Sequence, residues 1–301
     1  MANLLVAGLI NVETTVRVDG FPIAYQPQNF PFFGLRTTVS GVGYNVTKAL
    51  TTLGHAVRLL SLIGDDLNGH LVRTAMASDG LNTAHVLTQM PQTAQSAILY
   101  DPAGRRENFT DLKDIQERAY PLERFTREAR GCDLLTICNI NFARGLLHEG
   151  KRLGKRIATD VHAIADLEDD FNRDFMAAAD ILFMSHERLP APPEEWARAV
   201  MARYAPSILV IGLGGEGALL AVKADEFLGR VPAVHTRPVV NTIGAGDALF
   251  SGFLHAYLQT GDPYHALRVA RVFASWKIGI SGGADGFLTA VALASLAAPL
   301  P

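Results

Sequence analysis

A glycine-rich turn and the carboxylate after it are the residues with the clearest chemical potential. Residues 241–254 read NTIGAGDALFSGFL, so the small residues Gly244, Ala245 and Gly246 lead directly into an apolar helix pattern. Successive backbone N–H groups at a helix N-terminus can bind a phosphate, and small side chains let it approach. Asp247 follows in the first helical turn, where a carboxylate can simply cap the helix. Beside an anion site it is better suited to accept a substrate proton while the amides neutralise a transferred phosphoryl group.

A second glycine-rich turn, SGVGYN at 40–45, precedes another helical pattern. A glycine turn followed by an asparagine cap would explain these residues in structural terms alone. The functional interpretation is a backbone that approaches a polar ligand closely at Gly41, with Asn45 offering both a donor and an acceptor to hydroxyl groups.

The elements that must position these residues alternate along the chain. Short apolar runs predict buried strands, and apolar residues at helical spacing between them predict helices. The expected strands are 3–10, 56–64, 133–140, 155–161, 180–185, 207–212 and 218–223, and the expected helices are 45–53, 67–79, 123–130, 170–179, 194–204 and 263–277. This order predicts an α/β fold with a mostly parallel sheet, right-handed crossovers and helices on both faces.

Two segments interrupt the alternation. Residues 12–39 contain several prolines and aromatic residues, and residues 93–111 read as a hairpin that turns at 101–104. We expect both segments to leave the main sheet and to pair as a small β-structured lid over the mouth of the pocket; two irregular surface loops are the alternative. Because there is no repeat or linker, residues 1–301 are interpreted as one domain that carries this lid.

Composition narrows the class of partner. The chain has 301 residues, of which 27 are basic and 30 acidic, and 49% are hydrophobic. No block of like charge is present, which argues against nucleic acid or an anionic membrane as partner and favours a small molecule. The two cysteines form neither a disulfide framework nor a zinc pattern, as expected in a reducing compartment. The N-terminus lacks the basic region of a signal peptide and no apolar run is long enough to span a bilayer, so we predict a cytoplasmic protein.

Both glycine-rich turns resemble the two signatures of the ribokinase-like (PfkB) family of carbohydrate kinases. The matching residues are Gly41, Gly43, Asn45 and Thr47 in the first signature and Gly244, Ala245, Gly246, Asp247, Ser251 and Gly252 in the second. The opening strand at 8–11 and the LGGEG turn at 213–217 are similar to family elements as well, so the resemblance extends over nearly the whole chain.

The resemblance implies a ribokinase-like three-layer fold and a reaction. In that reaction the γ-phosphate of ATP, as its magnesium complex, moves to a hydroxyl of a sugar or sugar derivative. Asp247 would be the catalytic base, and Gly244, Ala245 and Gly246 would form the anion hole. The implied binding residues are Asn11, Glu13, Gly41, Asn45 and Asn141 for the substrate, Thr242, Gly214 and Gly217 for the nucleotide, and Glu187 for the metal.

Several positions depart from the family pattern. Glu13 stands where the family usually has Asp, Val42 replaces the usual lysine of the glycine loop, and Asn141 replaces an acidic substrate residue. The magnesium-associated Asn-x-x-Glu element falls at SHER, 185–188, where Glu187 is the substitute carboxylate. Asn241 stands where many members have Asp, which leaves a requirement for a monovalent cation open.

Two competing motifs lack the context that they need. GLGGEG at 212–217 matches the dinucleotide fingerprint but is followed by a strand pattern instead of a helix. GISGG at 279–283 matches the nucleophile elbow but follows a helical pattern instead of a strand, so a loop is expected there. No Walker A sequence is present, which excludes a P-loop.

The sequence therefore predicts an ATP-dependent kinase whose acceptor is a sugar or sugar derivative with a primary hydroxyl. A nucleoside kinase of the same fold is the first alternative, because Phe30, Phe32, Phe33 and Tyr44 could stack a base. Packing within the lid or a homodimer contact through it explains these aromatic residues equally well. A non-catalytic sugar- or nucleotide-binding protein is the alternative from another class, suggested by the altered magnesium element.

Overall fold

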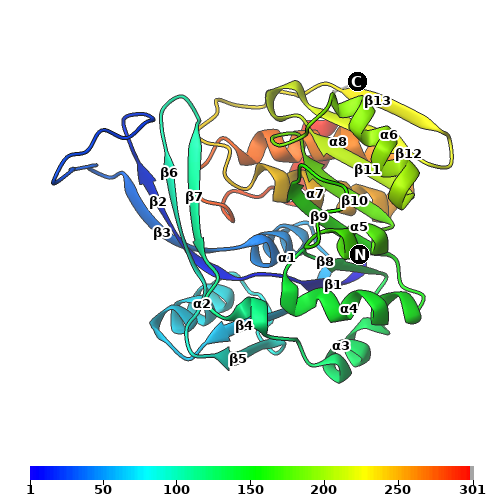
Figure 1. The fold of residues 1–301 in the computed structure, drawn as a ribbon, viewed down its shortest axis with the longest axis horizontal. Coiled ribbons are helices and arrows are strands. Elements are labelled where there is room, and N and C mark those ends of the chain that lie inside the picture. Colours follow the sequence, from blue (N-terminus) through cyan, green and yellow to red (C-terminus); the bar gives the residue numbers. More distant parts are fainter. Residues whose placement is uncertain (299–301) are drawn as a thin grey trace.

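The main sheet contains nine strands in a computed structural model that describes residues 1–298 (Figure 1). The strand order is β13-β12-β11-β10-β9-β8-β1-β4-β5. Every pair from β11 to β5 is parallel, whereas β11–β12 and β12–β13 are antiparallel. The strands are β1 (Asn3–Ala7), β4 (Ala56–Gly64), β5 (Val86–Met90), β8 (Leu134–Ile137), β9 (Ile157–Ala163), β10 (Ile181–Ser185), β11 (Ile208–Gly212), β12 (Ala218–Val222) and β13 (Phe227–Val231). The mostly parallel sheet expected from the sequence is confirmed.

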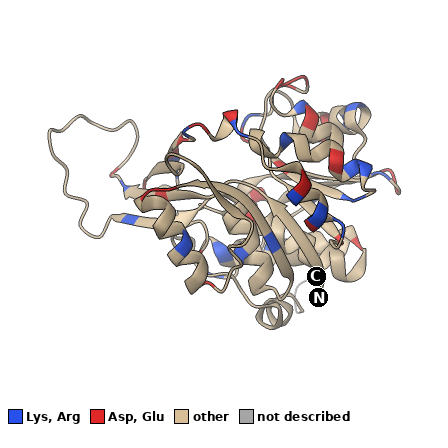
Figure 2. Cartoon of the chain, turned by 90° about the horizontal axis from the view of Figure 1, so that it is seen from below, with Lys and Arg blue, Asp and Glu red and all other residues tan. Residues whose placement is uncertain are grey.

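A separate sheet of four strands projects from one side of the molecule (Figure 1). Its strands are β2 (Asn11–Arg17), β3 (Leu35–Ser40), β6 (Gln95–Tyr100) and β7 (Arg106–Asp111). Both hairpins are antiparallel, and β2 pairs with β6 in parallel, which joins the two segments that interrupt the α/β alternation. The small separate sheet is thus confirmed, and its role as a lid stays a prediction. Figure 2 shows the long loop between β2 and β3, in which residues 20–34 carry no charge.

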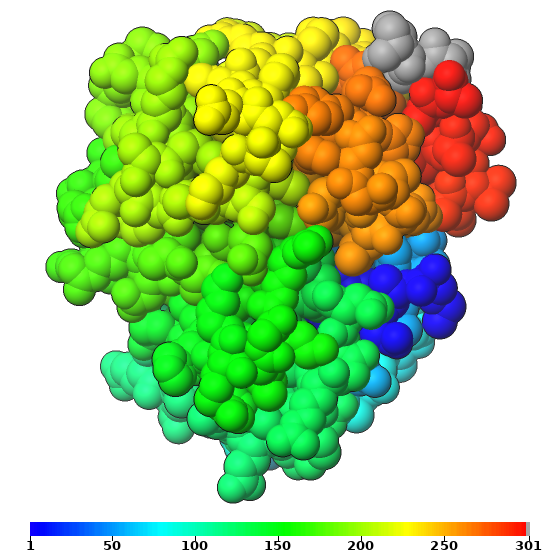
Figure 3. Space-filling view, turned by 90° about the vertical axis from the view of Figure 1, so that its right-hand side faces the viewer, coloured from blue at the N-terminus to red at the C-terminus, as the bar shows by residue number. Residues whose placement is uncertain are grey.

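Helices cover both faces of the main sheet. One face carries α1 (Val42–Thr52), α2 (Leu67–Ser78), α7 (Ala245–Thr260), α8 (Pro263–Lys277) and α9 (Ala290–Ala297). The other carries α3 (Leu122–Ala129), α4 (Asn141–Arg152), α5 (Arg173–Ala178) and α6 (Pro193–Tyr204). Two 3₁₀ turns, η1 (Ile115–Glu117) and η2 (Gly214–Glu216), complete the order. On the side away from the small sheet, blue N-terminal residues lie beside the orange and red C-terminal helices (Figure 3). None of the helices in the described part of the chain is both long and apolar enough to cross a bilayer.

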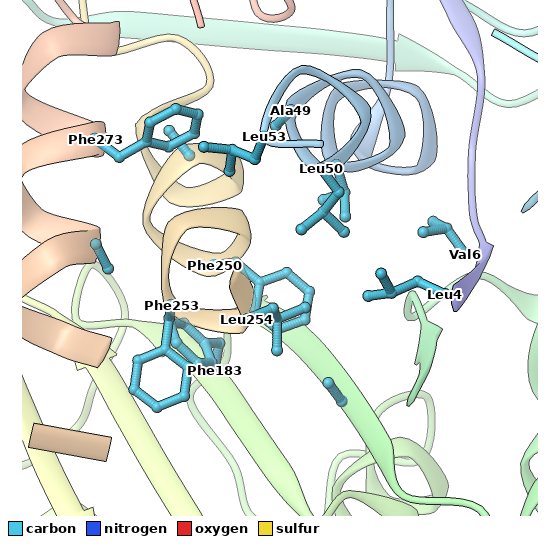
Figure 4. Packing of buried hydrophobic residues seen from close by; sticks show 14 of the residues in the cluster. Leu4, Val6, Ala49, Leu50, Leu53, Phe183, Phe250, Phe253, Leu254 and Phe273 are labelled. Atoms are coloured by element: carbon cyan, nitrogen blue, oxygen red, sulfur yellow. The ribbon is translucent and has the colours of Figure 1, made fainter. Parts of the chain in front are cut away.

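The buried strands send alternate side chains into two cores, one on each face of the sheet. In β1, Leu4 and Val6 belong to one cluster and their neighbours to the other, as expected of a strand covered on both sides. Figure 4 shows how this packing holds α7, because Phe250 and Phe253 lie against Phe183 of β10, at ring distances of 4.9 and 5.2 Å. The core therefore fixes the position of the helix that begins at the second glycine-rich turn.

Candidate active site

The N-terminus of α7 leaves backbone amides without helical partners. Gly244 is its N-cap residue with φ of 76°, and no side chain caps the helix. The N–H of Ala248 makes the first i→i−4 bond, to Gly244 O at 3.0 Å, so the preceding amides of Gly246 and Asp247 have no helical partner. The amide of Ala245 instead bonds to Thr242 O at 3.2 Å. Unpaired amides at a helix N-terminus favour a bound phosphate.

Asp247 and Asn45 meet at this point although 202 residues separate them in sequence. Asn45 Nδ2 donates to Asp247 Oδ2 at 2.6 Å. Neither side chain caps its helix. The N-cap residues are glycines in both cases, Gly41 of α1 with φ of 101° and Gly244 of α7, and neither helix has a side-chain cap. The structural explanation of both residues as helix caps is therefore wrong, and their polar groups face each other between the two helices.

Burial makes Asp247 a stronger base than an exposed aspartate. Burial raises its pKa, while the hydrogen bond from Asn45, the neighbouring His162 and the positive charge of Lys277 oppose that rise. The nearby carboxylate of Asp160 adds to it. A carboxylate with a raised pKa accepts a proton more readily at neutral pH.

The small sheet contributes two buried side chains to the same site. Asn11 and Glu13, both on β2, are 4% and 5% exposed, yet Asn11 Oδ1 and Glu13 Oε1 have no hydrogen-bond partner. Asn11 Nδ2 donates to Ser96 Oγ at 2.8 Å, which fixes the orientation of that amide. Ser40, which pairs with Asn11 in register, donates its hydroxyl to Asn45 Oδ1 at 3.3 Å. Two unpartnered acceptors thus lie beside the Asn45–Asp247 pair.

The loop after α8 closes around these residues. A Cβ atom on Gly283 would lie 2.6 Å from Ser40 Oγ, and one on Gly244 would collide with Gly283 O. Burial raises the pKa of Glu13, the Ser40 hydroxyl and the Gly283 backbone lower it, and the charge of Asp247 raises it. Segments from 11–13, 40–45, 244–247 and 283 therefore form one compact site.

Two of the residues expected at the nucleotide side lie beyond the carboxyl end of parallel strand β11, where α/β folds bind ligands. Gly214 and Gly217 follow β11 with φ of 59° and 106°. Packing alone also requires glycine at position 217, since a Cβ atom there would collide with Val231 O. Thr242 O accepts a hydrogen bond from Arg106 of β7 at 3.1 Å. Thr242 and Arg106 both line a cleft of about 560 Å³ between the β6–β7 hairpin and the main body.

The structure does not bring every expected residue together. Glu187 follows β10 and lines the same cleft, 3.7 Å from Arg106 and largely exposed. Asn141 begins α4, where Gln116 Oε1 accepts from its backbone N–H at 2.9 Å and its Oδ1 accepts from Arg144 at 2.9 Å. No hydrogen bond or ion pair in the described part of the chain joins Asn141 to Glu13 or Asp247, and its substrate role stays a prediction.

The sequence reasoning missed Asp160 and His162 on β9. Asp160 is buried, and its Oδ2 lies 3.9 Å from the position that a Cβ atom on Gly246 would take. His162 has a left-handed φ of 57°, and its N–H bonds to Asp160 Oδ1 at 2.8 Å. An acidic residue toward the carboxyl end of a parallel strand was the available signal.

One of the aromatic residues considered for base stacking is excluded. Tyr44 is 1% exposed, and its hydroxyl donates to the carboxylate of Asp79. Its ring therefore packs in the core and presents no free face to a ligand. Phe30, Phe32 and Phe33 are exposed, in the loop of the small sheet.

The fold and the comparisons with known proteins together identify an ATP-dependent phosphotransferase with a ribokinase-like fold and an alcohol-group acceptor. The model of the pfkB family carbohydrate kinases matches residues 1–290, and the chain belongs to this family.

Three relatives illustrate the range of the family. The chain is 28% identical to an ATP-dependent ribose-1-phosphate kinase of Halopiger xanaduensis, with 94% of each sequence covered. It is 27% identical to the acarbose 7(IV)-phosphotransferase of an Actinoplanes species, with 97% of each covered. A solved structure of a microbiome-derived acarbose kinase is similar with a TM-score of 0.88, at 28% identity and 99% coverage of each chain. The relatives are thus sugar kinases with different acceptors.

Proposed function

We propose that Asp247 is the base and that the N-terminus of α7 holds the transferred phosphoryl group. The acceptor O–H loses its proton to Asp247 as its oxygen forms a bond to the γ-phosphorus of ATP. The bond from that phosphorus to the β,γ-bridging oxygen breaks, and ADP leaves with the electron pair. The unpaired amides of Gly246 and Asp247 stabilise the charge on the phosphoryl oxygens.

We propose that the acceptor is a polyhydroxyl compound, and one observation carries this proposal. Asn11 Oδ1 and Glu13 Oε1 are buried acceptors without a donor, next to the Asn45–Asp247 pair. A buried acceptor left unpaired costs about 1–3 kcal/mol, which a ligand that supplies a donor recovers. Hydroxyl groups of a sugar supply such donors, and one further hydroxyl can face Asp247.

The charges favour an acceptor without a phosphate group of its own. Glu13, Asp160 and Asp247 surround the site. The arginines that approach from the small sheet are already paired, since Arg36 bonds to Asp285 at 2.7 Å and Arg106 to Thr242 O. We therefore propose a neutral or amine-bearing sugar as the preferred acceptor over a sugar phosphate.

The residues present are compatible with a magnesium ion held mainly by the nucleotide. No group of three potential ligands occurs within residues 1–298, but Mg²⁺ commonly uses one or two carboxylates with waters and phosphates. Glu187 lines the cleft with an accessible carboxylate, and Asp160 lies beside Gly246. We propose that these two would hold the ion through water, where it would neutralise phosphate charge. The chain's own contribution remains the amides and Asp247.

An ADP-release assay with purified protein and MgATP tests the function. The acceptor panel contains ribose, maltose, glucosamine, adenosine and ribose 1-phosphate. We expect the unphosphorylated sugars to raise ADP release well above the rate without acceptor. Release highest with ribose 1-phosphate would contradict the proposed charge preference, and release highest with adenosine would favour the nucleoside alternative. No release with any acceptor would favour a binding protein.

Two further expectations concern the cellular compartment and the oligomeric state of the enzyme. We propose that it works in the cytoplasm, which the free, buried Cys132 and Cys138 support. We propose a homodimer through the small sheet, supported by exposed Phe30, Phe32 and Phe33. Light scattering tests the second, and replacing the three aromatic residues with serine should yield a monomer.

A further inference from the structure

Lys277, the last residue of α8, has its ammonium group inside the protein. The residue is 0% exposed, which is rare for lysine unless the charge is paired. Its Nζ donates to Gly282 O at 2.6 Å and to Ile243 O at 3.3 Å. These carbonyls belong to two different turns, one leading into α7 and the other following α8. A single cation therefore joins the two turns that meet at the site.

The pinned carbonyls determine where the neighbouring amides point. In a planar trans peptide the C=O of one residue and the N–H of the next point in opposite directions. Holding Ile243 O on Lys277 thus turns the N–H of Gly244 away, at the start of the anion site. Holding Gly282 O turns the N–H of Gly283 away from Lys277, and the Gly283 backbone acts on Glu13. Lys277 orients one amide at the phosphate side and one at the acceptor side.

The groups that face Lys277 favour its charged form against the cost of burial. Burial lowers the pKa of Lys277 to about 8, and the charges of Asp285, Asp247 and Glu13 oppose this, with Arg237 acting in the same direction as burial. The lysine is therefore mainly protonated at neutral pH. Two carbonyl oxygens that converge on one point repel each other unless a cation lies between them.

Lys277 Nζ already stands where a free monovalent cation would meet these two carbonyls. The resemblance leaves a cation requirement open at Asn241. In the structure Asn241 Oδ1 accepts from the N–H of Ile243 at 3.1 Å, so one of its two lone pairs is used. Its Nδ2 is a donor and cannot coordinate a cation.

We propose that Lys277 is a positioning residue whose ammonium group serves as a built-in monovalent cation, so that phosphotransfer needs no K⁺ or Na⁺. This inference rests on the proposed roles of the 244–247 turn and Glu13. It predicts that removing the side chain creates a cation requirement that the natural protein lacks.

The first test measures the wild-type rate with MgATP and the best sugar acceptor. Potassium, sodium and tetramethylammonium chloride are compared at equal ionic strength. We expect the same kcat and KM in all three salts. A rate that rises specifically with potassium or sodium overturns the proposal.

The second test uses Lys277→Met, which keeps an unbranched side chain and removes the charge. We expect kcat to fall at least ~10-fold, because one misplaced anion-hole donor already costs about 10²–10³-fold. Potassium or methylammonium should restore part of the lost rate. Undiminished kcat, or a loss that no monovalent cation relieves, argues against the assignment.

A thermal readout separates this inference from the proposed function. A cation that binds only the folded variant raises its Tm, so potassium should stabilise Lys277→Met and leave the wild type unchanged. Lys155→Met is the matched control, since Lys155 also donates to two carbonyls, Arg130 O at 2.8 Å and Cys132 O at 2.7 Å, before the amino ends of β8 and β9. It should show no cation dependence.

The possible failures remain distinguishable. If the wild type transfers no phosphate to any acceptor, the proposed function fails, while the thermal comparison still tests Lys277. If Lys277→Met does not fold, the wild-type salt series decides alone. Lys277→Arg, which keeps the charge, should then fold and remain independent of potassium; a potassium-dependent Tm in that variant would also contradict the proposal.

Discussion

Replacing Asp247 by asparagine tests the proposed chemistry directly. The substitution keeps the shape of the side chain, and its carbonyl oxygen can still accept the hydrogen bond that Asn45 Nδ2 gives to Asp247 Oδ2 at 2.6 Å. The other position becomes an NH₂ group, which donates and cannot take the acceptor proton. General-base assistance is worth about 10²–10⁴-fold, or about 2.7–5.4 kcal/mol of barrier. We therefore expect kcat to fall by at least ~10²-fold.

The same substitution should leave folding and nucleotide binding intact. Burial raises the pKa of Asp247, so the folded state binds this proton more tightly than the unfolded state, and the ionised carboxylate opposes folding increasingly as pH rises above about 4. The asparagine variant should thus be at least as stable as the wild type at neutral pH. Its affinity for ATP should stay within a few fold, because the backbone amides remain.

The assay combines steady-state kinetics, isothermal titration with an ATP analogue and urea unfolding at neutral pH. Asp262→Asn is the matched control, because Asp262 caps α8 by accepting from Tyr264 N at 2.8 Å and His265 N at 3.1 Å. Asparagine caps helices about as well as aspartate, so this variant should keep full activity. An Asp247→Asn enzyme with wild-type kcat would refute the assignment of the base. A variant that is both inactive and clearly destabilised would point to a structural role instead.

Three further predictions use other parts of the molecule. Glu13→Ala should raise the KM for the sugar by a factor equivalent to ~1.5–3 kcal/mol, and unchanged kinetics would remove Glu13 from the site. If residues 12–39 and 93–111 act as a lid, their amides should gain protection from hydrogen exchange when sugar binds. Arg36→Ala, which loses the ion pair with Asp285, should weaken that gain. Equal protection with and without sugar would contradict a lid. His255 Nδ1 lies 2.9 Å from His55 Nε2, and burial lowers the pKa of His255 to about 4. Below pH 6.5 the unfolded state therefore binds a proton that the folded state does not. The free energy of unfolding should thus decrease as the pH falls from 6.5 toward 4. In His255→Gln this decrease should shrink; an identical pH dependence in both proteins would contradict the role of the pair.

Local patterns in the sequence were sufficient for most of the fold. The strand at 56–64 and the helix at 263–277 occur with the predicted bounds, because their apolar spacing and flanking residues are contained within each segment. The helix at 141–152 was not predicted, although Phe142, Ala143, Leu146 and Leu147 recur at helical spacing and pack in the core. The short edge strand β5 has only two buried positions and carries little signal.

The site was predictable only where it is contiguous in sequence. Both glycine-rich turns stand out because each is a run of small residues before a helix. Asp160 on β9 and Lys277 at the end of α8 also lie at the candidate site, and each is connected to it only through a turn that is distant in sequence. An aspartate toward the carboxyl end of a parallel strand is only a weak signal, and a lysine in the last turn of a helix is common, so local sequence could not connect either residue to the distant turn that it contacts. Asn141 is a different case, since its alignment position suggested a substrate contact, its side chain bonds to Gln116 and Arg144, and the substrate role stays a prediction.

Because Asn11 and Glu13 lie on β2, the residues proposed to bind the acceptor and those proposed to bind phosphate belong to different parts of the fold. In the proposed mechanism, the strand that contacts the acceptor is part of the small sheet, while the amides and carboxylate assigned to phosphate transfer belong to α7, which packs on the main core. Changes in one hairpin can therefore redirect the enzyme to a new acceptor without disturbing the way it uses ATP. Grafting the 12–39 and 93–111 hairpins of a relative onto this body is accordingly a direct route to a kinase with a different sugar and the same phosphate chemistry.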